Sequence, residues 1–173
     1  MRPFWGFLYL YRKEGIILDG CGHPPEKGGD AMKLRQIMTN PVIRIHPEET
    51  VAVAARTLAQ YNVGALPVCG SDGRLQGVVT DRDLVTRCLA SGRSPAVTAV
   101  SEVMTAQVVA VNPDMDLVEA AQIMGSRQVR RLPVVEQGRL CGMVSLGDLA
   151  GAMETGRDAM AALSEISGNL SRR

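Results

Sequence analysis

The chain has 173 residues, enough for one domain or for two small halves that share a core. Its 19 lysines and arginines nearly balance 18 acidic residues, and the net charge of +1 gives no electrostatic reason to expect nucleic acid or a membrane surface as a partner. No apolar run approaches the roughly 18 residues that cross a bilayer, so we expect a cytoplasmic protein without a membrane span.

Residues 1–31 differ in composition from the rest and are predicted to be a poorly structured N-terminal extension. They hold five of the six aromatic residues and end in a glycine- and proline-rich stretch, Gly20 to Gly29. Met32 looks like a natural start, so we interpret them as an upstream extension or a tail outside the fold. The alternative is an aromatic arm that docks on a partner. The apolar piece before this stretch lacks a convincing cleavage site, which argues against a signal peptide.

The chain from Met32 onward predicts a strand, a helix, a two-stranded hairpin and a second helix. The expected strands cover residues 42–45, 66–69 and 75–80, and the expected helices begin near Thr50 and Asp81. Prolines and a Ser-Asp-Gly turn bound the strands, while Ala54, Ala55 and Leu58 follow one another at helical spacing. Small alanines predict close packing of the first helix against a sheet or another helix.

The same elements recur in the second half of the chain. The expected strands cover residues 108–111, 132–135 and 139–144, and the expected helices begin near Asp116 and Leu146. Asp116 with Glu119 has the spacing of a capping box at a helix start. Residues 157–173 are predicted to be a C-terminal helix and tail.

The two halves are an internal repeat. Met38-Thr39 matches Met104-Thr105 at an offset of 66 residues, and Leu66-Pro67-Val68 matches Leu132-Pro133-Val134 at the same offset. One residue is lost in the hairpin turn, after which Asp83-Leu84 matches Asp148-Leu149 at an offset of 65. Internal matches of this number predict a duplicated unit.

The predicted fold class is therefore α+β, with two pseudo-twofold-related βαββα units packed through their sheets. The units are expected at residues 32–92 and 93–156. A unit of this size buries only a thin core alone, so the two sheet faces are expected to cover each other. This pairing would create two related clefts, each lined by the junctions between the last strand and the last helix of a unit.

Each junction carries a hydroxyl and an acid three residues apart, Thr80 with Asp83 and Ser145 with Asp148. One interpretation is structural, because this spacing is also that of a capping box. The other is a ligand site. The first N–H groups of a helix are unpaired and suit an anion, and a fixed carboxylate accepts hydrogen bonds from the vicinal diol of a ribose.

The loop before each hairpin differs between the halves. In the first half Gly64 and Ala65 present little side-chain bulk, so a planar base could approach the backbone. In the second half Arg130 and Arg131 stand at the matching positions, and an arginine offers a planar fork for phosphate, although a solvated charged pair is the simpler reading. The two clefts are therefore expected to differ in affinity.

These motifs together resemble the tandem CBS domain family, named for cystathionine β-synthase, as a stand-alone pair or Bateman module. The resemblance rests on Gly64-Ala65-Leu66-Pro67-Val68, on the segment Gly77 to Leu84, on both Met-Thr pairs and on the second Arg130-Arg131-Leu132-Pro133-Val134. It spans about residues 32 to 153 and includes both copies.

The resemblance implies a non-enzymatic regulatory module that binds AMP, ADP, ATP or S-adenosylmethionine, forms a homodimer and signals to a partner protein. It needs no cofactor beyond this regulatory ligand. The ligand-binding residues that it implies are Thr39, Val42, Ile43, Gly64, Ala65, Leu66, Thr80, Arg82, Asp83, Thr105, Val108, Val109, Val129, Arg130, Arg131, Ser145 and Asp148. The first cleft would use Thr80 and Asp83, the second Ser145 and Asp148.

Other functions stay open as alternatives. A redox- or metal-responsive module would use Cys69 and Cys141, with Cys21 and His23, although no CxxC or Cys/His ligand spacing occurs and reduced thiols are the simpler reading. A scaffold without a ligand is a further alternative. His46 is read as a loop histidine, and no catalytic or metal constellation stands out, so we expect no enzyme activity. Nucleic-acid binding is not expected, because the few arginines lack interleaved aromatics.

Overall fold

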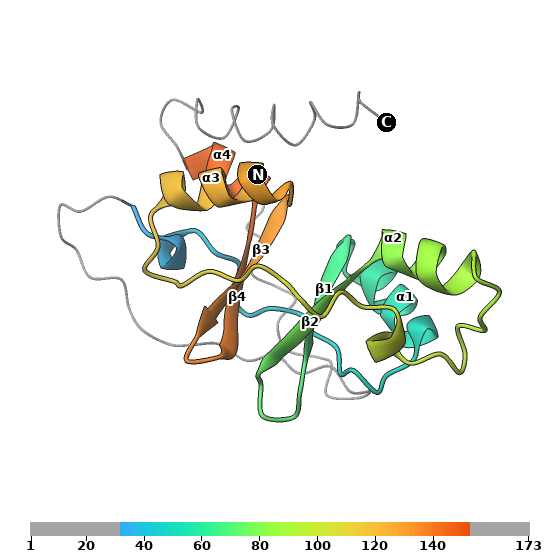
Figure 1. Ribbon diagram of the computed structural model, residues 1–173. Helices are drawn as coiled ribbons and strands as arrows, with labels where there is room; N and C mark the ends of the chain where they lie inside the picture. The colour runs from blue at the N-terminus through green and yellow to red at the C-terminus, as the bar shows by residue number, and fades with distance from the viewer. Residues whose placement is uncertain (1–31, 153–173) are drawn as a thin grey trace, which may run out of the picture.

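The computed structural model describes residues 32–152, which form two similar units side by side (Figure 1). The first unit contains α1 (Val51–Gln60), β1 (Ala65–Cys69), β2 (Leu75–Thr80) and a helix formed by α2 (Asp81–Asp83) and η2 (Leu84–Leu89). The second contains α3 (Leu117–Arg127), β3 (Arg131–Glu136), β4 (Arg139–Ser145) and α4 (Leu146–Ala152). Two short 3₁₀ turns, η1 (Leu34–Gln36) and η3 (Val100–Glu102), precede the units. The predicted α+β class and the duplication are confirmed.

The long helices begin where the sequence predicts. The hydroxyl of Thr50 accepts a hydrogen bond from the Val53 N–H at 3.3 Å, and Oδ1 of Asp116 accepts one from the Val118 N–H at 2.7 Å. These caps satisfy N–H groups that a helix start leaves unpaired. Just beyond each helix the backbone turns left-handed, at Asn62 (φ 50°) and Gln128 (φ 55°), which directs the chain into its hairpin.

Each hairpin is a two-stranded antiparallel sheet, and the two hairpins pack against each other. Each carries a bulge near its turn, between Val68 and Cys69 in one copy and between Val134 and Val135 in the other. A small cluster of Val42, Cys69 and Leu140 joins the hairpins, and the Leu75 N–H donates to the Gly138 carbonyl at 3.3 Å. The helices lie on the outer sides of the hairpins (Figure 1).

The predicted first strands at 42–45 and 108–111 are wrong in extent, because each pairs at a single residue. Ile45 bridges Val68 in parallel, and Val111 bridges Val134 in the same way. Extending the first pairing toward the N-terminus would require a hydrogen bond from the amide of Pro67, which has no N–H, and Pro133 imposes the same limit on the copy. The backbone preceding each bridge is thereby left without a ladder partner.

The segment that leads into each unit packs in the other unit. Leu34 is fully buried in the core of the second unit, and Val100 and Val103 are fully buried in the core of the first. In Figure 1 the blue turn η1 accordingly lies beside α3, and η3 lies beside α1. We call residues 33–39 and 99–105 the leading segments. The expected units at 32–92 and 93–156 thus describe the repeat in the sequence. In the folded chain, however, the leading segment of each unit packs in the core of the other.

Backbone hydrogen bonds hold the exchanged segments in place. Thr39 and Met143 exchange two of them, at 2.8 and 3.1 Å, and Thr105 and Val78 exchange two, at 2.9 and 3.0 Å. The Met-Thr pair of each copy therefore forms an extra edge on the hairpin of the other copy. This exchange brings residues of both units to each cleft.

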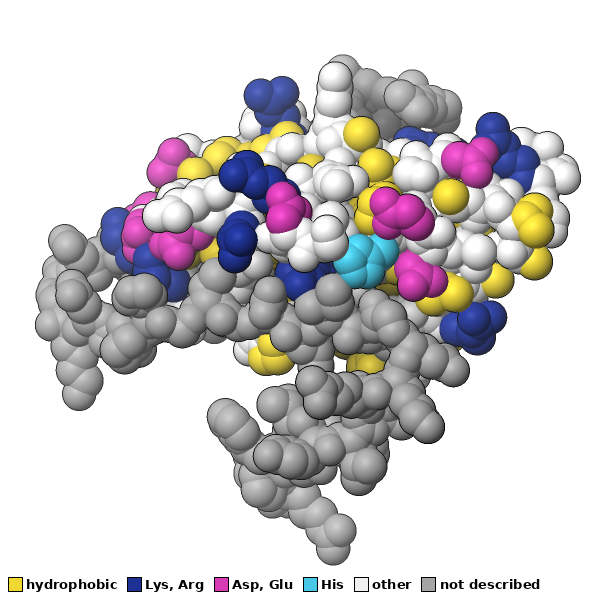
Figure 2. All heavy atoms as spheres, turned by 90° about the horizontal axis from the view of Figure 1, so that it is seen from below, with side chains coloured by type: hydrophobic (Ala, Val, Ile, Leu, Met, Phe, Trp, Pro, Cys, Tyr) yellow, Lys and Arg dark blue, Asp and Glu magenta, His cyan; other side chains and the backbone are white. Residues whose placement is uncertain are grey.

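Two expectations fall on residues that the structure does not describe, the extension at 1–31 and the tail at 157–173. Among residues 32–152, no helix is long and apolar enough to cross a bilayer. Seen from below, the described surface mixes acidic and basic side chains, and neither sign dominates this face (Figure 2).

Candidate functional site

A cavity of about 290 Å³ lies between the two units, and we call it the open cleft. The first unit and its leading segment contribute Thr39, Pro41, Val42, Ile43, Asn62, Val63, Ala65 and Pro67, and the second unit contributes Arg131, Met143, Val144, Ser145 and Asp148. Its wall is mostly apolar, and its second-unit side adds a guanidinium, a hydroxyl and a carboxylate from Arg131, Ser145 and Asp148. A mostly apolar hollow with a few convergent polar groups is the usual form of a small-molecule site.

A second, polar cavity of about 350 Å³ adjoins the open cleft. It is lined by Gly64, Asp81, Arg130, Arg131, Ser145, Leu146 and Gly147, and shares Arg131 and Ser145 with the open cleft. A Cβ atom on Gly64 would lie 3.6 Å from both terminal nitrogens of Arg131 and 3.6 Å from a carboxylate oxygen of Asp81. Gly64 therefore lies within van der Waals distance of both charged side chains, and the apolar cleft continues into a charged cavity.

The acid of each junction caps its own helix. Oδ2 of Asp148 accepts from the Ser145 N–H at 2.8 Å and from the Ser145 hydroxyl at 2.7 Å, and the Asp148 N–H donates back to that hydroxyl at 3.2 Å. Thr80 and Asp83 repeat the pattern at 3.0, 2.6 and 3.2 Å. The capping interpretation is thus confirmed at both junctions. Oδ1 of Asp148 has no partner among residues 32–152, so the capped acid retains an acceptor.

Most of the first helix N–H groups at these junctions already have acceptors. At the second junction the N–H groups of Ser145, Leu146 and Asp148 donate to Asp148, Arg130 and Ser145 respectively, whereas Gly147, which lines the polar cavity, has no acceptor for its N–H among residues 32–152. The first junction satisfies its N–H groups in the same manner, with Gly64 accepting from Asp81 at 3.4 Å. An anion in the polar cavity would therefore be held chiefly by Arg130 and Arg131.

The main chain of Ile43, a residue that lines the open cleft, has hydrogen-bonding groups that no described residue occupies. Ile43 lines the cavity and forms no main-chain hydrogen bond within the described part of the chain. The cause is Pro67, whose missing N–H stops the parallel pairing after Ile45. A planar heterocycle with donors and acceptors along one edge would satisfy these groups while its faces contact Val42, Ala65 and Met143.

The structure unites nine of the predicted site residues in the two cavities. They are Thr39, Val42, Ile43, Gly64, Ala65, Arg130, Arg131, Ser145 and Asp148. The predicted grouping is wrong, however, because the base-side residues of the first unit meet Ser145 and Asp148 of the second unit rather than Thr80 and Asp83. The direct packing of the two hairpins against each other accompanies this arrangement. It also brings in Pro41, Asn62, Val63, Pro67, Met143 and Val144, which the sequence reasoning missed.

The remaining predicted residues lie elsewhere. Leu66 is fully buried in the core of the first unit, because its side chain points away from the cleft face of β1. Arg82 is exposed and lines neither cavity. By the repeat, Thr80, Asp83, Thr105, Val108, Val109 and Val129 belong to the pseudo-symmetric counterpart of the open cleft, which we call the second cleft.

The cysteines do not form a reactive centre in the described chain. Cys69 and Cys141 are each 1% exposed, and with Cys88 they are free thiols. Burial raises the pKa of Cys69 to about 11, although the nearby Arg44 charge partly opposes this. A thiol with a raised pKa is a poor nucleophile and metal ligand. Within residues 32–152, no group of three or more His, Cys, Asp or Glu side chains could hold a metal ion.

The fold defines a duplicated module of two α+β units with cavities between them. The chain belongs to the CBS domain family, whose model matches residues 34–90 and 100–155. It is 44% identical over 134 residues to the CBS domain-containing protein YhcV of Bacillus subtilis, covering 78% of this chain and 94% of that relative. It is 37% identical over 116 residues to Hypoxic response protein 1 of Mycobacterium tuberculosis, covering 67% and 81%.

Solved structures show the same fold. The structure of Hypoxic Response Protein I with two coordinated zinc ions has a TM-score of 0.66 and 35% identity, covering 70% of this chain and 99% of that one. The CBS domain pair of protein MJ0100, in complex with 5′-methylthioadenosine and S-adenosyl-L-methionine, has a TM-score of 0.63 and 26% identity, covering 69% and 98%. These comparisons establish a CBS domain pair.

Proposed function

We propose that this chain is a non-enzymatic sensor that binds one adenosine-containing ligand in the open cleft and signals to a partner protein. The observation that carries the proposal is the meeting of three features in that cleft and the polar cavity that adjoins it. Apolar side chains and the unpaired main chain of Ile43 suit a purine, Oδ1 of Asp148 suits a ribose diol, and Arg130 and Arg131 suit phosphate. The adenosine compounds bound by the similar MJ0100 pair support the same ligand class.

The charge of the polar cavity favours an adenine nucleotide over S-adenosylmethionine. Arg130 and Arg131 face one carboxylate there, Asp81, so the lining carries a net positive charge. A phosphate gains charge-assisted hydrogen bonds from such a lining, whereas a sulfonium is repelled by it. We therefore place AMP, ADP or ATP before S-adenosylmethionine as the ligand.

Thermal unfolding of the full chain with a panel of compounds tests this function. Adenosine, AMP, ATP and S-adenosylmethionine would be compared with GTP, whose base presents a different hydrogen-bonding edge. A ligand at 100 times its Kd stabilises a fold by about 2.7 kcal/mol, which would raise the Tm by roughly 5–10 °C. If no adenosine compound raises the Tm at millimolar concentration, the proposal is wrong.

We propose that the signal passes through a homodimer formed by the helix of α2 and η2. Val85 and Leu89 lie one turn apart on this helix and are 54% and 55% exposed. Apolar side chains at this spacing form a stripe that a second copy of the chain would cover. Light scattering after size exclusion should give twice the chain mass for the wild type and the monomer mass for a Val85→Glu, Leu89→Glu variant.

A further inference from the structure

The second cleft differs from the open cleft by one arginine. The repeat aligns Asp83 with Asp148 at an offset of 65 residues, and four residues further on it aligns Arg87 with Ala152. Ala152 packs against the core of the second unit. The open cleft therefore has no cation at the position where the second cleft carries one.

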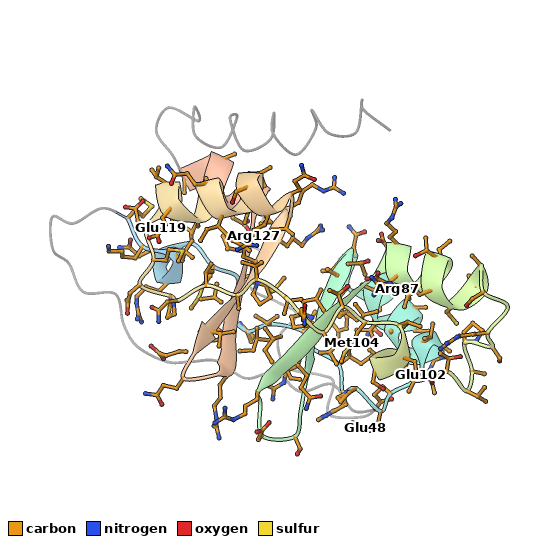
Figure 3. All side chains as sticks on the ribbon, viewed as in Figure 1. Glu48, Arg87, Glu102, Met104, Glu119 and Arg127 are labelled. Atoms are coloured by element: carbon orange, nitrogen blue, oxygen red, sulfur yellow. The ribbon has the colours of Figure 1, made fainter. Side chains whose placement is uncertain are left out.

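Arg87 connects the two sides of the second cleft. One terminal nitrogen, Nη1, donates to the carbonyls of Val103 and Met104 at 2.9 and 3.0 Å and to the Thr105 hydroxyl at 3.1 Å. Its Nε lies 3.4 Å from Oδ1 of Asp83. In Figure 3, Arg87 lies on the side of its helix that faces the segment carrying Met104.

Two of the four residues that Arg87 engages correspond to residues that line the open cleft. Thr105 is the counterpart of Thr39, and Asp83 is the counterpart of Asp148. Thr39 and Asp148 both line the open cleft, where Oδ1 of Asp148 has no partner among the described residues. In the second cleft the matching carboxylate oxygen and the matching threonine are joined by a single guanidinium.

The helix that carries Arg87 has an unusual winding. Residues Leu84–Leu89 form a π-helix, in which the Ala90 N–H donates to the Val85 carbonyl at 2.8 Å. A π-helical turn is rare and occurs frequently at functional sites. Arg87 lies within this turn, and its side chain reaches residues 103–105.

We propose that Arg87 is a built-in occupant of the second cleft and limits the chain to one adenosine ligand. This inference rests on the proposed function. A ribose at Asp83 would have to displace the guanidinium from that carboxylate, while hydrogen bonds to Val103, Met104 and Thr105 hold the guanidinium in place. We expect this competition to weaken binding at the second cleft by roughly 10- to 100-fold, so that the open cleft alone fills at ordinary ligand concentrations.

The stoichiometry of binding tests this inference. Isothermal titration of the full chain with AMP, and separately with S-adenosylmethionine, should give one ligand per chain for the wild type. Arg87→Ala and Arg87→Gln should each give two, with the first site unchanged. Arg56→Ala, which removes an exposed arginine of α1 outside both clefts, should keep a value of one. Circular dichroism would verify that each variant is folded.

Several outcomes would overturn the inference. Two ligands on the wild type, or one ligand on a folded Arg87 variant, would mean that Arg87 does not control the second cleft. If neither variant folds, the NMR signal of the Arg87 Nε–H in the wild type tests the inference instead. Its chemical shift should stay unchanged when the protein is saturated with AMP. A large change would contradict the proposal that Arg87 occupies the second cleft. A wild type that binds no adenosine compound refutes the proposed function itself, which is a different failure.

Discussion

Asp148 and Asp83 occupy equivalent positions in the repeat, yet we expect their removal to affect ligand binding differently. Both carboxylates cap their helices through Oδ2 with nearly identical geometry, at 2.8 and 2.7 Å for Asp148 and at 3.0 and 2.6 Å for Asp83. Only Asp148 lines the open cleft. The pair therefore separates the capping contribution from the ligand-binding contribution within one molecule.

The expected magnitudes follow from these contacts. Loss of a cap costs about 0.5–2 kcal/mol of stability, so Asp148→Ala and Asp83→Ala should lower the free energy of unfolding by similar amounts. Asp83 also pairs with Arg87, but that side chain is 47% exposed, and an exposed ion pair adds only about 0–1 kcal/mol. A hydrogen bond from a ribose hydroxyl to a carboxylate is worth about 1.5–3 kcal/mol, or roughly a 10- to 150-fold change in Kd.

Calorimetric titration with AMP and urea unfolding would be carried out on the two variants and the wild type. We expect Asp148→Ala to weaken AMP at least 10-fold and Asp83→Ala to change its Kd by less than about threefold. The urea midpoints should fall together, which verifies that the variants differ in binding rather than in folding. Equal Kd values for the two variants would refute the assignment of the open cleft as the ribose site.

Three further predictions concern other parts of the molecule. Arg131→Ala should weaken ATP about 10-fold but leave adenosine unchanged in titrations, because it removes a phosphate contact, and Arg127→Ala, outside both cavities, should change neither. Gly77→Ala should destabilise the fold by about 1–3 kcal/mol in urea unfolding, since its Cβ would lie 2.8 Å from the Thr105 carbonyl oxygen, whereas Gly151→Ala meets nothing within 4 Å. Burial raises the pKa of Cys69 from 9.0 to about 11, so the unfolded chain releases the thiol proton at a lower pH than the folded chain. The neutral thiol therefore contributes to stability below pH 9, and this contribution is lost as the pH rises to 11. Relative to Cys69→Ala, the wild type should lose about 2–3 kcal/mol of its free energy of unfolding between pH 9 and 11 in urea unfolding. The same pH dependence in both proteins would contradict a raised pKa of Cys69.

The local elements could be predicted from the sequence because their signals are local. The caps at Thr50 and Asp116, the hairpin turns and the hydroxyl–acid pairs each depend on residues within a few positions of one another. The duplication was visible for the same reason, since it needs only a comparison of the chain with itself. Nine of the predicted site residues accordingly line the two cavities.

The crossing of the units could not be predicted, because the two copies offer equivalent partners. Met38-Thr39 and Met104-Thr105 have the same sequence, and so each could pair with either hairpin edge. Only the length and path of the connections decide that Thr39 joins Met143 while Thr105 joins Val78. The sequence does contain the difference at Arg87. An arginine follows Asp83 by four residues in the first copy, and an alanine, Ala152, stands at the matching position in the second copy.

The exchanged leading segments also bear on how this chain arose and how it divides. Residues 40–98 lack Val100 and Val103, which complete their hydrophobic interior, and residues 106–152 lack Leu34 in the same sense. A single copy expressed alone would expose that apolar gap until another copy filled it. Two identical half-length chains that exchanged their first turns would bury the same apolar residues, so a symmetric two-chain ancestor is physically self-consistent.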